Sequence, residues 1–391
     1  MVSCSPSPVT NNTVASCVAT VTDTDVGAAI TPSGSVGFAS NSTGVFSQPS
    51  CARAATGTAG VASCSVNYTP GVTGFHAITA SYAGDSSHLG RSGSMTLTVV
   101  GAAPKPAYAL IVSADGKVSR LYQNGTLALI GQPVTTPLRS VAWKPDGSYA
   151  LISGDFAVLL KYDGTTLTTI PIGISTGFNF WSVSWKPDGS YALVGGTSGI
   201  LFKYDGVKVT IISNASTTIL SINWQPSGSY ALLVGKSGLA LTYDGTIVRS
   251  FATGTAFDLD AAAWNPNGVY ALIGGLNRTL LQFDGTTVAA INTSIVPPNN
   301  AIRAISFNQA GTMALLAGDN GMVLTWNGST LTMLPTLTSS YLYSIGWSPS
   351  GMAYIVGGSG IVLTYTNGIL AKLATSPVTT TQYRGIAWKP Q

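Results

Sequence analysis

Tyr383-Arg384-Gly385-Ile386-Ala387-Trp388-Lys389-Pro390 is the last of seven copies of one phrase in this chain. Each earlier copy is centred on an aromatic residue, and the six centres are Trp143, Trp185, Trp224, Trp264, Phe307 and Trp347. With Trp388 included, successive centres lie 42, 39, 40, 43, 40 and 41 residues apart. A period of about 40 residues, with several short strands in each unit, is the sequence signature of a β-propeller.

Each unit also contains a hairpin signal between two apolar runs. The signals are Asn124-Gly125, Asp163-Gly164, Asp205-Gly206, Asp244-Gly245, Asp284-Gly285, Asn327-Gly328 and Asn367-Gly368. Asp-Gly and Asn-Gly favour a type I′ turn because both of its central residues need positive φ. The first unit begins at residue 107 with the phrase that elsewhere follows the Trp-centred strand, so it lacks the innermost strand. We therefore expect residues 383–391 to complete it, giving a seven-bladed propeller over residues 107–391 with no open edge.

The composition favours an all-β protein and excludes several partners. Of the 391 residues, 45% are hydrophobic and 8% are charged, 45 are Gly, and all 14 acidic residues are Asp, so Glu, a good helix former, is absent. The net charge of +4 is spread along the chain, which indicates neither a nucleic-acid-binding surface nor a membrane-surface helix. No apolar run approaches the ~18 residues of a transmembrane helix, and the N-terminus lacks a signal-peptide pattern, as in a mature form.

Residues 1–100 lack the 40-residue period and contain all four cysteines and both histidines. The strands predicted here are short and rich in β-branched residues, at 16–22, 34–38, 62–68, 74–82 and 94–100. A domain of about 100 residues with about seven strands suggests an immunoglobulin-like β-sandwich. Residues 101–106 contain two prolines and are predicted to form a short, fairly stiff linker to the propeller.

The cysteines are spaced in two pairs, Cys4 with Cys17 and Cys51 with Cys64, each 13 residues apart. We predict disulfides within these pairs, one of three connectivities that four cysteines allow. Metal binding is the alternative, but no CxxC or Cys/His spacing supports it. Disulfides indicate an extracellular or cell-surface location. Eight candidate glycosylation acceptors agree with such a location: Asn11, Asn41, Asn67, Asn124, Asn214, Asn277, Asn292 and Asn327.

Two segments resemble known families. Residues 34–38, 64–70 and 74–85, with Gly74-Phe75-His76-Ala77-Ile78-Thr79-Ala80 at the start of the last, resemble the bacterial Ig-like repeats of large prokaryotic surface proteins. That resemblance implies a stalk or spacer. Repeats such as residues 185–196 and 199–206 are similar to WD40-like and BNR-like propellers, including the photosystem assembly-factor type. The chain departs from these families because it lacks the Gly-His and Trp-Asp dipeptides of WD40 repeats and any Glu of a sialidase-type site.

The propeller lacks the groups that most hydrolytic sites require. It has no His, Cys or Glu, which excludes Ser-His-Asp and Cys-His systems, the usual zinc sites and glycosidase pairs that use Glu. Nine Asp residues occupy repeating turns, where each is expected to accept local backbone hydrogen bonds: Asp115, Asp146, Asp155, Asp163, Asp188, Asp205, Asp244, Asp284 and Asp319. Asp258 and Asp260 instead lead into an inner strand, where we expect pairing with an Arg or calcium ligation. The sequence thus predicts no enzyme, no cofactor and no metal centre.

Three classes of function remain. The first, which we favour, is a structural or adhesive surface protein in which a stalk presents a propeller head to other surface proteins or to copies of itself, with a layer or filament as one arrangement. The second is a binding module for an acidic glycan or another anionic ligand, and the third is a polysaccharide hydrolase or lyase. Five aromatic residues in long connections suit the first two if they are exposed, although they could instead pack in the core: Phe178, Phe180, Trp181, Tyr341 and Tyr343.

One column of the repeat, four residues before each anchor, predicts a binding site at the mouth of the channel. In order round the ring it reads Arg384, Arg139, Trp181, Leu220, Asp260, Arg303 and Tyr343. Arg303, Tyr343, Arg384 and Arg139 fall on consecutive blades, and we expect them to form a cationic sector with Asp260 facing it. Arg binds carboxylate, sulfate or phosphate through parallel hydrogen bonds, and Tyr343 and Trp181 are expected to stack on a sugar. Alternatively, these Arg residues are solvated or pair with Asp260 and loop carbonyls.

Overall fold

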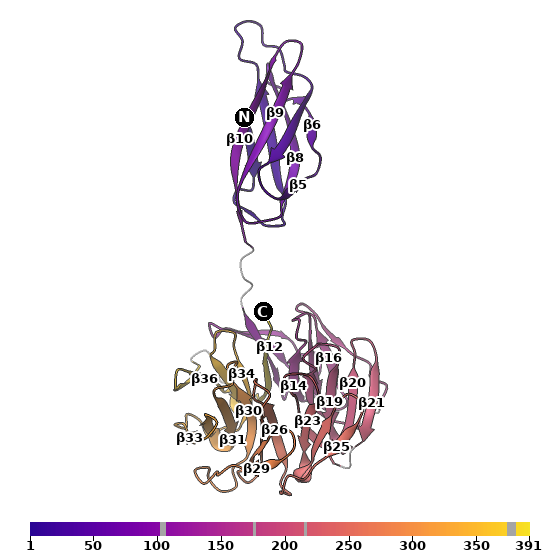
Figure 1. The fold of residues 1–391 in the computed structure, drawn as a ribbon, viewed down its shortest axis with the longest axis vertical. Coiled ribbons are helices and arrows are strands. Elements are labelled where there is room, and N and C mark those ends of the chain that lie inside the picture. Colours follow the sequence, from indigo (N-terminus) through magenta and orange to yellow (C-terminus); the bar gives the residue numbers. More distant parts are fainter. Residues whose placement is uncertain (102–106, 175–176, 215–216, 374–380) are drawn as a thin grey trace. The chain divides into compact units, whose positions relative to one another are not determined.

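The structure is a computed structural model that describes residues 1–101, 107–174, 177–214, 217–373 and 381–391 (Figure 1). The chain divides into two compact units, Met1–Lys105 and Pro106–Gln391. Residues 102–106 of the predicted linker lie outside the described residues, as do residues 215 and 216 of the sequon at Asn214.

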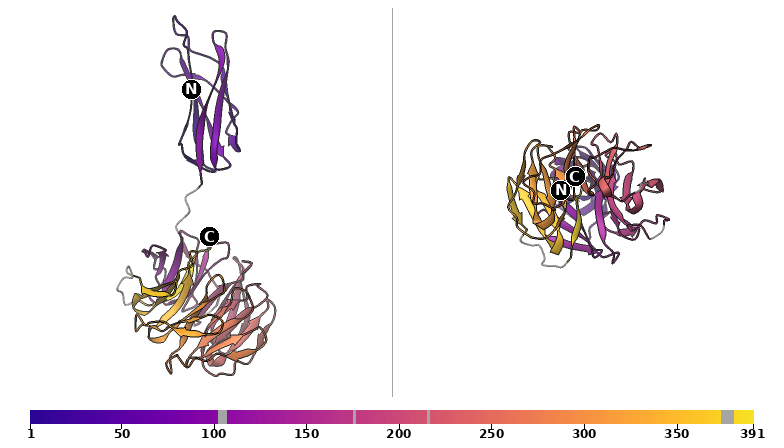
Figure 2. Two further views of the ribbon diagram at one scale, coloured as in Figure 1. Left: turned by 60° about the vertical axis from the view of Figure 1, so that its left-hand side comes forward. Right: turned by 90° about the horizontal axis from the view of Figure 1, so that it is seen from below.

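The second unit is a propeller of seven four-stranded antiparallel sheets, which Figure 2 shows arranged around a centre. From the inner strand outward, the first three blades are β38(Tyr383–Trp388), β11(Tyr108–Ser113), β12(Val118–Tyr122), β13(Leu127–Gly131); β14(Leu138–Trp143), β15(Ala150–Gly154), β16(Leu159–Tyr162), β17(Leu167–Thr169); and β18(Phe180–Trp185), β19(Ala192–Gly196), β20(Ile200–Tyr204), β21(Val209–Asn214). The fourth and fifth are β22(Ile219–Trp224), β23(Ala231–Gly235), β24(Ala240–Tyr243), β25(Val248–Ser250); and β26(Leu259–Trp264), β27(Ala271–Gly275), β28(Leu280–Phe283), β29(Val288–Ala290). The last two are β30(Ile302–Phe307), β31(Ala314–Gly318), β32(Val323–Trp326), β33(Leu331–Met333); and β34(Leu342–Trp347), β35(Ala353–Gly357), β36(Val362–Thr366), β37(Ile369–Lys372).

Four blades carry a short 3₁₀ turn after their second strand. These turns are η1(Thr197–Gly199), η2(Lys236–Gly238), η3(Asp319–Gly321) and η4(Gly358–Gly360).

The C-terminal strand closes the ring, as the sequence predicts. β38 pairs antiparallel with β11, with Trp388 opposite Ala109 and Ile386 opposite Ile111. The first blade is therefore built from both ends of the unit. β38 covers the inner edge of β11, so the first blade has four strands like the other six.

Aromatic residues pack between neighbouring blades. The anchor of one inner strand lies edge-on against a Tyr of the blade before it, with ring centroids 5.3 Å apart for Tyr149 and Trp185 and 5.6 Å apart for Tyr191 and Trp224. The same contact recurs between Tyr230 and Trp264, Tyr270 and Phe307, and Tyr108 and Trp143. Phe307 can replace Trp because the joint requires an aromatic edge against an aromatic face.

The first unit is a two-sheet structure with one shared core. One sheet contains β1(Val2–Ser5), β3(Ala15–Thr22), β8(Val61–Pro70), β5(Gly44–Phe46) and, beside β8, β7(Ala54–Ala55); the other contains β2(Val9–Thr10), β10(Leu89–Val100), β9(Gly74–Gly84), β4(Ser35–Ser40) and β6(Ser50–Ala52). Side chains from both sheets, such as Cys17 and Tyr68 from one and Ile78 and Leu97 from the other, form one buried cluster. This is the sandwich arrangement; its immunoglobulin-like type stays a prediction.

Both cysteine pairs are joined as predicted, but the two disulfides connect different parts of the unit. Cys4 and Cys17 are opposite one another on paired strands β1 and β3. Cys51 lies on β6 and Cys64 on β8, so this disulfide joins the two sheets, beside the short hairpin in which Ala54 of β7 pairs with Ser63 of β8. Sequence spacing could not show this difference, because both pairs are 13 residues apart.

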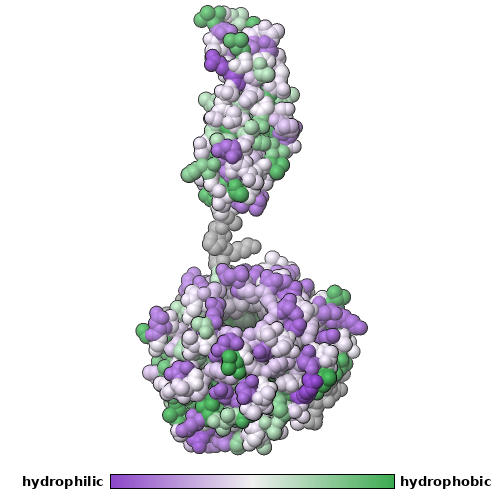
Figure 3. Space-filling model, viewed as in Figure 1, coloured by the Kyte–Doolittle hydropathy of each residue, from purple (hydrophilic) through white to green (hydrophobic). Residues whose placement is uncertain are grey.

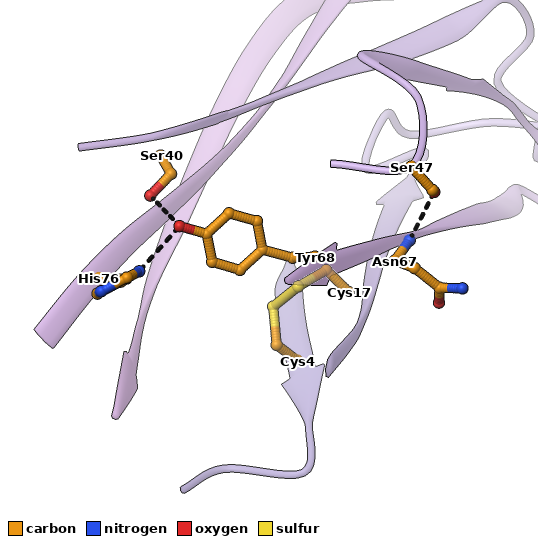
Figure 4. Close-up of a disulfide and its surroundings, with 7 residues drawn as sticks. All are labelled: Cys4, Cys17, Ser40, Ser47, Asn67, Tyr68 and His76. Atoms are coloured by element: carbon orange, nitrogen blue, oxygen red, sulfur yellow. Dashed lines mark hydrogen bonds between the residues drawn. A yellow bond between two sulfur atoms is a disulfide. The ribbon is translucent and has the colours of Figure 1, made fainter. Parts of the chain in front are cut away.

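Near the first disulfide, Tyr68 crosses the core and is fully buried (Figure 4). Its hydroxyl lies 2.8 Å from His76 Nδ1 and 3.0 Å from Ser40 Oγ. The polar end of a large buried side chain is thus hydrogen-bonded, which avoids the cost of an unsatisfied group.

Removing residues 383–391 is expected to prevent stable folding of the propeller, because it uncovers the inner edge of β11 and removes one side of two blade contacts. Trp388→Ala alone should lower the free energy of unfolding by on the order of 3 kcal/mol. Denaturant unfolding of the propeller unit measures both, with deletion of Gln391 alone as the control. A cooperative transition of normal midpoint from the truncated chain would contradict this account of closure.

The two disulfides provide a matched comparison, since they close loops of equal length, each worth about 3 kcal/mol in the chain-entropy model. We expect Cys51→Ser with Cys64→Ser to destabilise the first unit more than Cys4→Ser with Cys17→Ser. The strands that carry Cys4 and Cys17 remain hydrogen-bonded without the disulfide, whereas β6 and β8, which carry Cys51 and Cys64, belong to different sheets and are not paired with each other. Thermal unfolding of the two double variants tests this, and equal losses would show that loop length alone determines the effect.

Candidate binding site at the channel mouth

A β-bulge occurs at the same place in all seven inner strands. Each inner strand pairs with the second strand of its blade on both sides of one skipped residue, and the skipped residues are Arg139, Trp181, Leu220, Asp260, Arg303, Tyr343 and Arg384. A bulge leaves its extra residue out of the ladder and redirects its side chain. The seven predicted column residues are thereby brought together, and they line a cavity of about 150 Å³. We refer to these seven residues as the mouth ring.

A glycine in the second strand makes room for the bulge in six blades. A Cβ added to Gly235 would lie 2.0 Å from the carbonyl oxygen of Thr218, and one added to Gly318 would lie 1.9 Å from that of Ala301. No side chain fits at such distances. An interior glycine in a strand is a known sign of a bulge or of close backbone approach, so the sequence did contain a signal for this feature.

A second hollow, of about 180 Å³, lies further along the channel. It shares all seven residues of the mouth ring and adds the following residues of the inner strands, among them four serines and several small residues. The serine hydroxyls accept backbone N–H groups of the next blade: Ser140 from Val183, Ser182 from Ile222, Ser221 from Ala262 and Ser344 from Ile386. These bonds satisfy inner-strand donors that no further strand can reach. Figure 3 shows the propeller hollowed at its centre.

Arg139 is held by an aspartate of its own blade. Its Nε donates to Oδ1 of Asp155 at 2.8 Å and its Nη2 to Oδ2 at 2.6 Å, a bidentate pair. The guanidinium also lies 4.2 Å from the ring centroid of Trp181. The carboxylate of Asp155, which we expected to accept local backbone hydrogen bonds, pairs with Arg139, because the bulge directs the Arg139 side chain toward it.

Arg303 lies between two carboxylates. Its Nε and Nη2 donate to Asp319, and its Nη1 lies 3.2 Å from Oδ2 of Asp260. Asp319 also accepts the N–H of Ala301, 18 residues earlier in the chain. We expected this Asp to accept backbone groups close to it in sequence, and it instead binds Arg303 and a distant N–H. Asp260 does not face the cationic sector from across the ring; it pairs with the neighbouring Arg303, as one alternative allowed.

The pairing of Arg139 and Arg303 had a sequence signal that was missed. In both blades an Asp follows the Arg by 16 residues, directly after the glycine that ends the second strand. Blades without Arg in the column lack this Asp. The six other propeller aspartates of the hairpin and Pro-X-Gly turns accept local backbone N–H groups, as predicted: Asp146, Asp163, Asp188, Asp205, Asp244 and Asp284.

Arg384 differs from the other two arginines because no carboxylate pairs with it among the described residues, and the remaining segments contain no acidic residue. Its Nη2 donates to Oε1 of Gln382, and its guanidinium lies 4.1 Å from the ring centroid of Tyr343. Its Nε is buried and has no hydrogen-bond partner in the described part of the chain. Burial, and after it the charges of Arg139 and Arg303, lower the pKa of Arg384, against an opposing effect of Tyr343.

The pKa of Asp260, the acidic residue of the mouth ring, is also shifted. Burial raises the pKa of Asp260 to about 6, in spite of the opposing charge of Arg303. The carboxylates of Asp258 and Asp319 act in the same direction as burial, and Lys236 opposes them. Asp258 itself accepts the N–H of Ser237 at 2.9 Å.

The other predicted aromatic contacts are only partly present. Phe180 is fully buried in the core of the third blade and Phe178 packs against the same cluster, so neither is an exposed ligand platform. Tyr341 is exposed, while Trp181 and Tyr343 line the mouth. One face of each of these last two rings is covered by an arginine. Both rings therefore serve first as supports for guanidinium groups.

Two kinds of feature are absent from the described ranges. No group of three or more His, Cys, Asp or Glu side chains is arranged there to hold a metal ion. No helix in those ranges is both long and apolar enough to span a bilayer.

Comparison with known proteins supports the architecture. The sequence matches no family model and no curated protein. The fold matches 1161 chains of solved structures, so it identifies a widely shared architecture and not one activity. One of them is a WD40 β-propeller in a structure described as a crystal structure of the mitotic checkpoint complex; it aligns with a TM-score of 0.55 and 16% identity over 64% of this chain and 80% of that chain. At this identity the likeness shows the propeller fold alone.

Asp260 is expected to make stability depend on pH. The pKa of Asp260 is raised in the folded state. Its stabilising contribution to folding is therefore fully present at pH values below its unfolded pKa of about 4, and it is lost as the pH rises through about 6. Between pH 4 and pH 7 the free energy of unfolding of Asp260→Asn should therefore rise relative to that of wild type, by on the order of 1–3 kcal/mol. Denaturant unfolding across this range measures the difference, and parallel curves for the two proteins would contradict the assignment. Asp146→Asn, in an exposed turn, is the control.

Proposed function

We propose that the protein is a non-catalytic protein of an extracellular or cell-surface location, in which the two-sheet unit acts as a spacer and the propeller acts as the head that contacts other proteins. The observation that carries this proposal is the combination of two disulfides in the first unit with a closed ring in the second. Disulfides persist in oxidising compartments, and a small β unit gains much of its stability from them. A closed ring offers a rigid surface on which loops of several blades can meet one partner.

The chemistry of the propeller supports a role without catalysis. The acids Asp155 and Asp319 are already paired with arginines, and the six aspartates of the hairpin and Pro-X-Gly turns hold backbone N–H groups. Asp260 has a raised pKa, which is a property of many general acids, but Asp258, whose charge contributes to that rise, accepts the N–H of Ser237 in η2. Charged pairs of this kind fix the shape of a surface. The prokaryotic origin and a layer or filament remain further parts of the same proposal.

The location can be tested on native material. An antibody against the propeller should label intact cells, or fibres and particles shed from them, in electron micrographs. The cysteines of protein taken directly from that material should be blocked to thiol reagents unless a reductant is added. Labelling that requires permeabilised cells, together with free thiols at all four positions, would show that the proposal is wrong.

The eight sequons provide an independent expectation for the same location. Six of the candidate Asn side chains are exposed: Asn41, Asn67, Asn124, Asn277, Asn292 and Asn327. Their use as glycosylation sites stays a prediction, because Asn side chains at such places also stabilise turns, as Asn124 and Asn327 do here.

A further inference from the structure

We propose that the mouth ring binds one carboxylate group, presented by an acidic segment of a partner protein. This inference rests on the proposed function in one respect, that the propeller contacts proteins, and it assigns those contacts a chemistry and a place. The group that would receive the carboxylate is Arg384, with Arg139 and Trp181 on the two blades that follow it round the ring.

The first argument is the unequal pairing of the three arginines. Asp155 and Asp319 each accept from Nε and Nη2 of one guanidinium, whereas in the described part of the chain Arg384 donates to the amide oxygen of Gln382 and to no carboxylate. Arg384 is half-buried, and a partly desolvated cation without a counterion is costly; the cost is recovered when an anion binds. Its unpartnered Nε lies on the edge of the guanidinium that a carboxylate engages in a two-bond contact.

The second argument concerns the size of the ligand group. The two hollows lined by the mouth ring are about 150 Å³ and about 180 Å³, each below the ~300–1,000 Å³ of pockets that enclose whole small molecules. A carboxylate on a slender stem, such as a Glu or Asp side chain, fits such a space. The rest of the ligand would remain outside the ring.

The third argument separates a polypeptide from a saccharide. Sugars are bound largely through stacking on aromatic faces, and one face of both Trp181 and Tyr343 is already occupied by an arginine. A sugar would have to displace these guanidinium groups from at least one of the rings or use their remaining faces. A carboxylate side chain needs one edge of Arg384, where it would engage the unpartnered Nε and share Nη2 with Gln382. The geometry therefore favours an acidic polypeptide over the acidic glycan expected from the sequence.

The choice of variant follows from the pairing. Changing Arg139 or Arg303 would leave Asp155 or Asp319 buried without its partner, which is expected to destabilise the blade. Arg384→Gln removes a cation that no carboxylate depends on, and Arg384→Lys keeps the charge but not the two-bond edge. Arg249→Gln, an exposed arginine on outer strand β25, is the control with the same change in net charge. Near-ultraviolet circular dichroism and melting of each variant verify that the ring remains folded.

The probes are the capped peptide Gly-Glu-Gly, its Gln counterpart, glucuronate and glucose, each titrated into the full chain at about 20 mM and about 200 mM salt and followed by NMR. We expect the Glu peptide to bind wild type and Arg249→Gln with a Kd of about 1 mM at low salt, more weakly at high salt, and the Gln peptide not to bind. Arg384→Gln should lose at least about tenfold in affinity and Arg384→Lys less. Asp260→Asn should bind more tightly, because it removes a negative charge from the ring.

Equal binding of the Glu peptide by wild type and Arg384→Gln would overturn the site. Tighter binding of glucuronate than of the Glu peptide, through Arg384, would overturn the assignment to a protein partner in favour of a saccharide. No binding of any probe would overturn the inference as a whole. None of these outcomes alters the labelling of intact cells or the state of the thiols, so failure of this inference and failure of the proposed function are distinguishable.

Discussion

The edge-to-face contact between an aromatic anchor and a tyrosine of the preceding blade is the interaction on which the propeller depends. It sets the separation of successive inner strands, and it recurs at five joints of the ring in the same arrangement. The anchor stands at a fixed place in the repeat, so it also places the mouth residues at a fixed distance before it. Closure by β38 completes this geometry, because the last anchor, Trp388, contacts Tyr354 of the seventh blade.

The mouth ring follows from the same regularity combined with one local irregularity. Without the bulge, the column residue of each inner strand would alternate with its neighbours and belong to the ladder. With the bulge, seven side chains of different chemistry converge on one opening. The charges of Arg139 and Arg303 are each compensated by an Asp of the same blade, 16 residues further along the chain. Arg384 is left out of this compensation because the residue that follows β11, at the position of Asp155 and Asp319 in their blades, is Ala114; the next residue, Asp115, pairs with Lys117 and Ser113.

The first unit is stabilised in a different way. A sandwich of about 100 residues has a small core, and one cross-sheet disulfide between Cys51 and Cys64 fastens the two layers that this core must hold together. At its centre, Tyr68 fills the space between the sheets and is hydrogen-bonded at its hydroxyl by His76 and Ser40. A unit fastened in this way suits the spacer role that we propose for it.

The sequence by itself determined the number of blades, their closure by residues 383–391, the pairing of Cys4 with Cys17 and of Cys51 with Cys64, and the membership of the mouth ring. These features depend on spacing along the chain, which a repeat makes visible. Only the tertiary structure decided that Arg139 and Arg303 pair with Asp155 and Asp319, that arginines cover Trp181 and Tyr343, that Phe180 is buried, and that one disulfide joins the sheets. The physical reason is that these contacts depend on side-chain direction and on strand neighbours. A one-residue bulge changes that direction without changing the period of the sequence.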